Sequence, residues 1–300
     1  MNNVRGLLVL LMFCVLLAFN VGAQANAVYK KEIDDWHSQR IADLKADDGW
    51  LNLIGLFWLD EGKNSFGSDS SNDIVFPPGT VTKTMGYFER TGNSVKMVIT
   101  ENGPVYMDSQ RVKDAVIFTA DMQNVPVVSC GSLRWIIIKR DDKIGVRLRD
   151  INSKAPAAFT GVDRFPVDST WRIPAMLQKP ALPSTIAITN IIGQTTKQAS
   201  PGKLVFSISG KQYTLDAMEE GDELFIVFGD ATSGITTYPS GRFVYTKKPG
   251  ANGLTMIDFN KAYNPPCAFT DYATCPLPPR QNILPVAVTA GEKNYGTHHR

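Results

Sequence analysis

Residues 258–282 restrict the fold more than any other part of this chain, because they contain five prolines, two cysteines and three asparagines. Each proline fixes φ, removes a backbone donor and restricts the residue before it. The segment is therefore too rigid for a flexible linker and too irregular for a strand. Long, stiff loops that hold polar side chains in place often carry binding or catalytic surfaces. We expect such a surface here.

The first 27 residues have the pattern of a secretory signal peptide. A basic residue, Arg5, precedes the apolar run 7–21, and the small residues A-Q-A-N-A follow at 23–27. This predicts cleavage after Ala25 or Ala27. The apolar run is short for a bilayer span, which disfavours an uncleaved anchor. The sequence predicts a periplasmic or extracellular protein with no stable membrane anchor after cleavage.

Three cysteines remain after removal of the signal peptide, which contains Cys14. Cys267 and Cys275 close a short loop, and an oxidising compartment favours a disulfide between them. Cys130 would then remain as a thiol without a disulfide partner. A zinc site needs about four ligands, and the only histidines are His37, His298 and His299. We therefore favour the disulfide over a metal site, with two unpaired thiols as the alternative, and predict no metal and no cofactor.

The remaining pattern predicts a mainly β protein made of antiparallel sandwich or partly open barrel units with one N-terminal amphipathic helix. The helix is expected at residues 28–48, where apolar residues recur at three-to-five-residue steps. A sandwich-like β unit is expected at 49–154 and a second β unit at 184–293, followed by a tail at 294–300. The proline-rich connection 155–183 between them contains a weakly helical stretch at 175–179.

Turn signals between apolar strands predict three hairpins. Their turns are expected at residues 91–93, 141–143 and 209–210.

Several long motifs of this chain closely resemble a bacterial and archaeal family. They are D-F-N-x-A-Y-N-P-P-C-A-F, C-P-L-P-P-x-x-N and A-G-E-K near the end, G-W-L-x-L-x-G-L-x-W-L near the start, and F-x-D-x-T-S-G-x-x-T-Y-x-x-G-R-F between them. The family is domain-of-unknown-function family 1684, and the resemblance spans residues 49–293. It implies a shared fold and no established activity, so no catalytic residue carries over.

A second resemblance concerns fold alone. The stretch G-S-D-S-S-N-D-I-V-F-P at 67–77 is similar to the opening of forkhead-associated phosphopeptide-binding sandwiches. It departs from them by lacking the Ser…His pair that usually follows.

The glycine-punctuated segment 230–242 is the first candidate site. It gathers a carboxylate, hydroxyl groups and a guanidinium that are suited to a polar or anionic ligand, namely those of Asp230, Thr232, Ser233, Tyr238 and Arg242. The alternative is that Asp230 and Ser233 only satisfy backbone donors of their own loop.

The second candidate lies in the proline-rich segment itself. It presents an acid, two amides and a phenol, which are suited to sugar-like or amide-containing ligands; these belong to Asp258, Asn260, Tyr263 and Asn264. The alternative is again that these groups satisfy the backbone of the loop. Asp230 and Asp258 each follow an expected strand, so they are also weak candidates for a paired catalytic acid and base.

The third candidate combines A-G-E-K at 290–293, R-L-R-D at 147–150 and the pair Trp171-Arg172. For Glu292 and Lys293 the ordinary explanation is a structural ion pair. Alternation places Arg147 and Arg149 on one face of a strand. On an inner face they would need acids or an anionic ligand to offset burial. On an outer face they would be solvated.

Charge and histidine content exclude several functions. The formal net charge of +2 gives no field for nucleic acid, and no basic-aromatic pattern suggests it. The scarcity of histidine disfavours a Ser-His-Asp triad. The sequence therefore predicts a secreted protein that binds a small polar or anionic molecule in a loop-built pocket. The alternatives are a metal-independent hydrolase or lyase with paired carboxylates, and a structural envelope protein.

Overall fold

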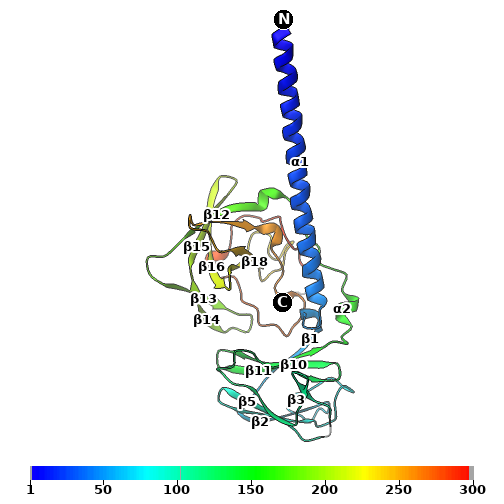
Figure 1. The fold of residues 1–300 in the computed structure, drawn as a ribbon. Coiled ribbons are helices and arrows are strands. Elements are labelled where there is room, and N and C mark those ends of the chain that lie inside the picture. The colour runs from blue at the N-terminus through cyan, green and yellow to red at the C-terminus, as the bar shows by residue number, and fades with distance from the viewer. Residues whose placement is uncertain (1, 102, 297–300) are drawn as a thin grey trace. The chain divides into compact units, whose positions relative to one another are not determined.

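The computed structural model describes the backbone of residues 2–101 and 103–296, with side chains from Gln24 onward. A single helix, α1, runs through Asn2–Lys45 (Figure 1). The expected helix thus ends close to the predicted point but begins much earlier, because no proline interrupts the preceding residues. Among the residues whose side chains the structure describes, no helix is long and apolar enough to cross a membrane. The tail residues 297–300, which include two of the histidines, lie outside the described residues.

The protein is mainly β, as predicted, and its sheets are almost entirely antiparallel. The chain forms two compact units. We call them the sandwich unit (Ala42–Thr160 and Pro266–Cys275) and the barrel unit (Met1–Ile41, Gly161–Pro265 and Pro276–Arg300).

The sandwich unit contains two sheets with one hydrophobic core. Its first sheet has the order β1-β11-β10-β9-β6-β7: β1 Leu53–Trp58, β6 Tyr106–Met107, β7 Gln110–Arg111, β9 Val128–Cys130, β10 Leu133–Arg140 and β11 Lys143–Asp150. The second has the order β3-β2-β4-β5-β8: β2 Gly62–Gly67, β3 Ile74–Val75, β4 Gly86–Thr91, β5 Ser94–Ile99 and β8 Asp114–Phe118. Phe66, Phe76, Phe88 and Trp135 are fully buried between these sheets.

The barrel unit is built on one nearly closed sheet with the order β18-β17-β16-β15-β12-β19. Its strands are β12 Arg172–Gln178, β15 Gly202–Ile208, β16 Lys211–Glu220, β17 Glu223–Phe228, β18 Arg242–Lys247 and β19 Leu254–Asp258. Side chains join the two outer strands: the Thr246 hydroxyl lies 2.9 Å from that of Thr255 and 2.7 Å from the Met256 carbonyl. A separate hairpin consists of β13 Ser184–Thr189 and β14 Thr195–Ser200.

All three predicted hairpins are confirmed. They join β4 to β5, β10 to β11 and β15 to β16, with the turns at the predicted residues. Gly92, Asp141 and Ser209 have positive φ at these turns. Tight hairpin turns favour this conformation because it matches the twist of the strands.

The predicted helical stretch at 175–179 is wrong. Residues 175–178 belong to β12, which strictly alternates buried and exposed positions, and Lys179 follows the strand. Pro174 fits this strand because pairing with β15 begins only at Ala175, so its missing N–H is not needed on that side. Helical residues in the connection are limited to α2 (Ala155–Ala158) and the 3₁₀ turn η2 (Ser169–Trp171).

The proline-rich segment divides between the units, whereas the sequence placed it wholly in the second β unit. Its middle part, Pro266–Cys275, belongs to the sandwich unit. The Thr270 hydroxyl donates to the Leu53 carbonyl at 3.1 Å, and Arg140 Nε donates to the Thr274 hydroxyl at 3.2 Å. These contacts attach the segment to β1 and β10.

The predicted disulfide between Cys267 and Cys275 is absent from the structure. The two residues are nevertheless neighbours. The backbone N–H of Cys267 donates to Sγ of Cys275 at 3.1 Å, and the reciprocal contact is 3.4 Å. Burial raises the pKa of the Cys275 thiol strongly. Cys130 is buried in the sandwich core.

Candidate functional site

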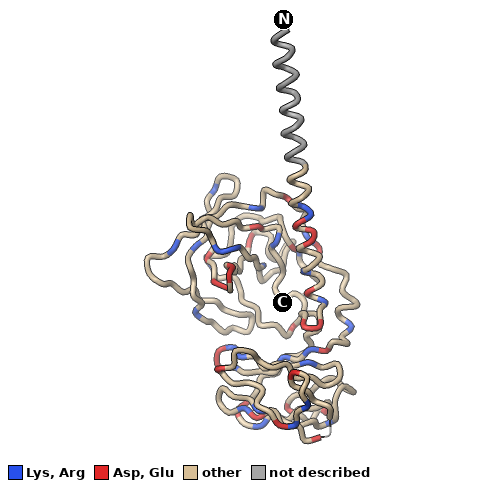
Figure 2. The backbone as a smooth tube through the Cα atoms, viewed as in Figure 1, with Lys and Arg blue, Asp and Glu red and all other residues tan. Residues whose placement is uncertain are grey.

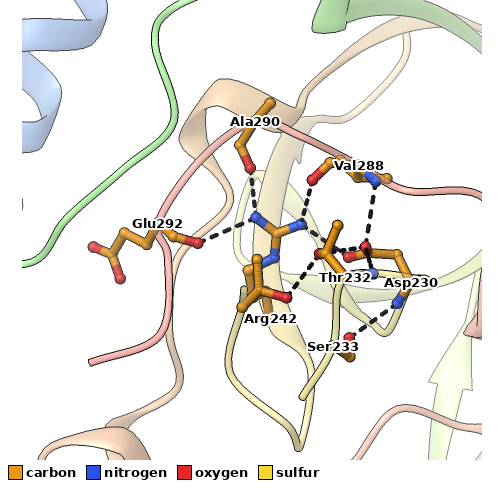
Figure 3. A network of polar contacts seen from close by, with 8 residues as sticks. Asp230, Thr232, Ser233, Arg242, Val288, Ala290 and Glu292 are labelled. Atoms are coloured by element: carbon orange, nitrogen blue, oxygen red, sulfur yellow. Dashed lines mark hydrogen bonds and ion pairs between the residues drawn. The ribbon is translucent and has the colours of Figure 1, made fainter. Parts of the chain in front are cut away.

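Asp230 and Arg242 form a completely buried ion pair in the barrel unit (Figure 3). Arg242 Nη2 lies 2.9 Å from Asp230 Oδ2. The same guanidinium donates to three backbone carbonyls of the C-terminal segment, those of Val288, Ala290 and Glu292. Asp230 Oδ1 accepts from the backbone N–H and the hydroxyl of Thr232 and from the N–H of Val288.

This network uses the first candidate residues internally. Ser233 Oγ accepts from the Asp230 N–H at 3.1 Å, and the Thr232 hydroxyl lies 2.8 Å from that of Thr237. Tyr238 is 4% exposed. Asp230, Thr232, Ser233 and Arg242 therefore lie in one network, and their polar groups hold loop 230–242 to the C-terminal segment. A ligand would have to displace a buried ion pair to reach them, and breaking such a pair costs several kcal/mol.

Asn264 and Glu292 form a second buried network. The Asn264 N–H donates to Glu292 Oε2 at 2.7 Å, and its amide donates to the Lys293 carbonyl at 2.7 Å. Arg40 of α1 reaches both residues, with Nε 3.4 Å from Glu292 Oε1 and Nη2 3.0 Å from the Asn264 carbonyl. The Arg40 guanidinium also lies 4.6 Å from the ring centre of Tyr263. Burial raises the pKa of Glu292, with Arg40 opposing the shift.

Asp258 and Asn260 join a residue that the sequence did not single out, Tyr29 of α1. The Tyr29 hydroxyl lies 2.8 Å from both carboxylate oxygens of Asp258, and the Asn260 amide donates to Tyr29 at 3.0 Å. The Asn260 N–H donates to Asp258 Oδ1 at 3.1 Å. Burial, strengthened by the Asp258 carboxylate, raises the pKa of Tyr29.

Arg172 stands beside this network. It lies directly opposite Asp258 in the β12–β19 pairing, and its guanidinium is 5.5 Å from the ring centre of Tyr29. It is exposed and makes no hydrogen bond or ion pair with the described residues. Glu32, one turn along α1, is paired with Lys261 at 2.7 Å, which lowers the pKa of Glu32.

An open cavity of about 450 Å³ lies here, lined by Gln24, Ala25, Val28, Tyr29, Glu32 and Arg172. Its wall therefore carries one unpaired guanidinium, one carboxylate and the edge of the buried Tyr29–Asp258–Asn260 network. Of the predicted site residues, Asp258 and Asn260 are the ones connected to this cavity. Arg172 and Asp258 are 86 positions apart in the sequence and lie opposite each other only through the β12–β19 pairing. Local sequence patterns therefore gave no signal that these two residues are neighbours.

Asn282, the last residue of the proline-rich segment, binds two barrel strands at once. Its Oδ1 accepts from the Asp216 N–H at 2.7 Å. Its amide donates to the carbonyls of Asp216 and Val227, both at 2.9 Å. The side chain is 1% exposed and joins β16 to β17, so the sequence motif that ends in Asn282 has a structural role here.

Arg147 belongs to the sandwich unit. It is on the face of β11 opposite to the core residues Val146 and Leu148, yet it is only 7% exposed. We expected an arginine on the outer face to be solvated, and this expectation fails for Arg147. The ring of Trp50 covers its guanidinium, with the ring centre 5.3 Å from the guanidinium carbon.

Basic and acidic residues are interspersed along both units (Figure 2). Among the side chains of residues 24–101 and 103–296, no three of His, Cys, Asp or Glu are grouped so as to hold a metal ion. The candidate site is thus a cavity in a mainly β protein whose C-terminal loops are held by buried polar networks.

The family comparison matches residues 157–293 to the model described as protein of unknown function (DUF1684). A solved structure, an uncharacterized protein from Haloarcula marismortui, shares 30% identity over 47% of this chain and 80% of its own, with a TM-score of 0.39. The chain belongs to this family of proteins of unknown function. The matched region includes the motifs from residue 230 onward and excludes the motif at 49–59.

Two FHA domains are also similar in structure. One, described by its phosphothreonine-dependent interactions, shares 14% identity over 31% of this chain and 92% of its own, with a TM-score of 0.22. The other, the FhaA FHA domain in complex with the intracellular domain of Rv3910, shares 12% identity over 31% of this chain and 97% of its own, with a TM-score of 0.23. Comparison with curated proteins gives no match.

Proposed function

We propose that the barrel unit binds a small polar molecule with an anionic group in the cavity between α1 and the start of β12. The observation that carries this proposal is Arg172, an exposed guanidinium with no hydrogen bond or ion pair among the described residues, on the wall of a cavity of about 450 Å³. Small-molecule sites generally combine a concave surface with a few convergent polar groups.

The chemistry of the cavity favours a carboxylate-bearing ligand. An arginine presents a planar fork of donors that matches a carboxylate. Tyr29 stacks beneath the guanidinium of Arg172 and restricts its position. Glu32, which also lines the cavity, would accept hydrogen bonds from hydroxyl or amino groups of the same ligand.

The hydrolase or lyase alternative has less support. It requires Asp230 to act with Asp258 as acid and base, yet both oxygens of Asp230 are already bonded to Arg242, Thr232 and Val288. Proton transfer would need the buried pair to open. The structural-protein alternative predicts that no small molecule binds.

We expect Arg172→Met to weaken ligand binding while leaving the fold intact, because the arginine is exposed and makes no hydrogen bond or ion pair with the described residues. Thermal unfolding with a panel of small carboxylates, hydroxy acids and amino acids would identify a ligand, since binding to the native state raises Tm. Loss of a charge-assisted pair should weaken binding about tenfold to a hundredfold. The matched control is Arg111→Met, an exposed arginine of the other unit. A ligand that binds both variants equally would place the site elsewhere.

We also propose that the protein is exported and that its signal peptide is removed. The support is the basic residue, apolar run and small residues of the first 27 positions. Cleavage after Ala25 or Ala27 would remove Gln24 and Ala25 from the cavity wall, so the mature cavity would be wider at Tyr29.

Export would also expose Cys267 and Cys275 to an oxidising compartment. Their adjacency supports the disulfide that the sequence predicts. Intact-mass measurement of the protein from its own host should give a chain that starts at Asn26 or Val28 and gains the mass of two hydrogens on reduction. A full-length chain, or one unchanged by reductant, would contradict the export or the disulfide, respectively.

A further inference from the structure

The outer face of the β10–β11 hairpin concentrates positive charge. The register pairs Arg134 with Arg149 directly and Ile136 with Arg147, so all of these side chains share one face of the sheet. Directly opposed like charges destabilise a sheet pair. Arg140 lies on the same face by alternation, close enough to affect Arg147.

Arg147 is the unusual member of this group. It is 7% exposed, its Nε is buried without a hydrogen-bond partner, and it makes no hydrogen bond or ion pair with the described residues. Burial, with Arg140 and Arg149 adding to it, lowers the pKa of Arg147 to about 10. A buried charge normally has a partner that offsets desolvation.

The groups around Arg147 provide no such partner. Trp50 lies against the face of its guanidinium, and this contact leaves the N–H donors in the guanidinium plane unused. Cys275 is nearby but offers no negative charge, because burial raises the pKa of its thiol and a disulfide at this position would also be neutral. Arg149 also makes no hydrogen bond or ion pair with the described residues, and its Nε is likewise buried without a partner.

A cavity of about 210 Å³ adjoins this face. It is lined by Asp47, Asp48, Val127, Arg134, Trp135, Ile136 and Arg149. Asp48 is close enough to Arg149 to offset part of its charge. Arg147, next to Ile136 across the strands, has no comparable acid.

We propose that this face is a phosphate-binding site, in which Arg147 and Arg149 hold a phosphate group through their unused donors. A dianionic phosphate would compensate the like charges and supply acceptors for the buried N–H groups. The Trp50 ring lies against the Arg147 guanidinium and restricts its position. The site is in the sandwich unit and is independent of the ligand proposed for the barrel unit.

The test is a titration of the full chain with sodium phosphate, compared with sodium chloride at matched ionic strength. We expect Tm to rise with phosphate and not with chloride. Arg147→Met should weaken phosphate binding about tenfold to a hundredfold, the factor expected from losing one charge-assisted pair. Without phosphate, Arg147→Met should be at least as stable as the parent chain, because the methionine removes an uncompensated buried charge.

Arg111→Met, an exposed arginine of the same unit, is the matched control and should leave the phosphate response unchanged. Arg149→Met provides a second variant should Arg147→Met not fold, and ³¹P line broadening provides a readout independent of stability. Comparison with glycerol phosphate assigns the source, since tighter binding of the ester indicates an organic phosphate. Equal effects of phosphate and chloride, or an unchanged phosphate response in both arginine variants, would overturn the proposal.

Discussion

Arg242→Met should destabilise the barrel unit by about 3–5 kcal/mol, the range for removing one partner of a buried ion pair. The guanidinium is completely buried, and its loss leaves the Asp230 carboxylate without a counter-charge. It also leaves the carbonyls of Val288, Ala290 and Glu292 without this donor. Urea unfolding followed by circular dichroism would measure the change in the free energy of unfolding.

The double variant Asp230→Leu/Arg242→Met separates the cost of leaving the Asp230 carboxylate without a counter-charge from the cost of leaving the backbone carbonyls without a donor. It removes the stranded carboxylate together with its partner, so it should be more stable than Arg242→Met alone. Arg172→Met, which removes an exposed arginine of the same unit, should change stability by less than about 0.5 kcal/mol. An Arg242→Met protein within about 1 kcal/mol of the parent chain would show that the network does not hold the loops together.

Asn282→Ala should cost about 3–5 kcal/mol, because one side chain serves three backbone groups on two strands. The substitution would leave the N–H and carbonyl of Asp216 and the carbonyl of Val227 unpaired in a buried position. Each unsatisfied buried group costs about 1–3 kcal/mol. Thermal or urea unfolding measures the effect.

Two further asparagine variants sharpen this prediction. Asn282→Asp keeps the acceptor but places a carboxylate against two carbonyls, so it should be no better than alanine. Asn152→Ala changes an exposed asparagine and should be nearly neutral. If Asn282→Ala lowered the free energy of unfolding as little as Asn152→Ala, the claim that Asn282 stabilises the barrel unit by joining β16 to β17 would be refuted.

The sequence predicted the strands better than the sites. Hairpin turns at residues 91–93, 141–143 and 209–210 were predictable because turn residues and alternating apolar residues act locally. The helix at 175–179 was wrong because burial of alternate residues in β12 outweighed weak helical propensity. The division of residues 258–282 between two units depends on long-range contacts, which no local pattern reveals.

The environment of the site residues also depends on long-range contacts that local sequence patterns do not reveal. The sequence proposed Asp230, Thr232 and Arg242 as parts of a ligand site, whereas in the structure they are buried and bonded to one another and to the C-terminal segment. Arg172 and Tyr29 carry the proposed cavity; the sequence named Arg172 only as part of the third candidate and did not single out Tyr29. Arg172 acquires its setting from a pairing with Asp258, and Tyr29 from a contact between α1 and β19.

The most direct test of the barrel-unit proposal is native mass spectrometry of the protein purified gently from its own host, alongside Arg172→Met and Arg111→Met. The proposal predicts a small molecule bound to the parent chain and to Arg111→Met, and its loss from Arg172→Met. A bound molecule retained by Arg172→Met would contradict this site. A bare parent chain that also binds none of the screened carboxylates, hydroxy acids or amino acids would contradict ligand binding and favour a structural role.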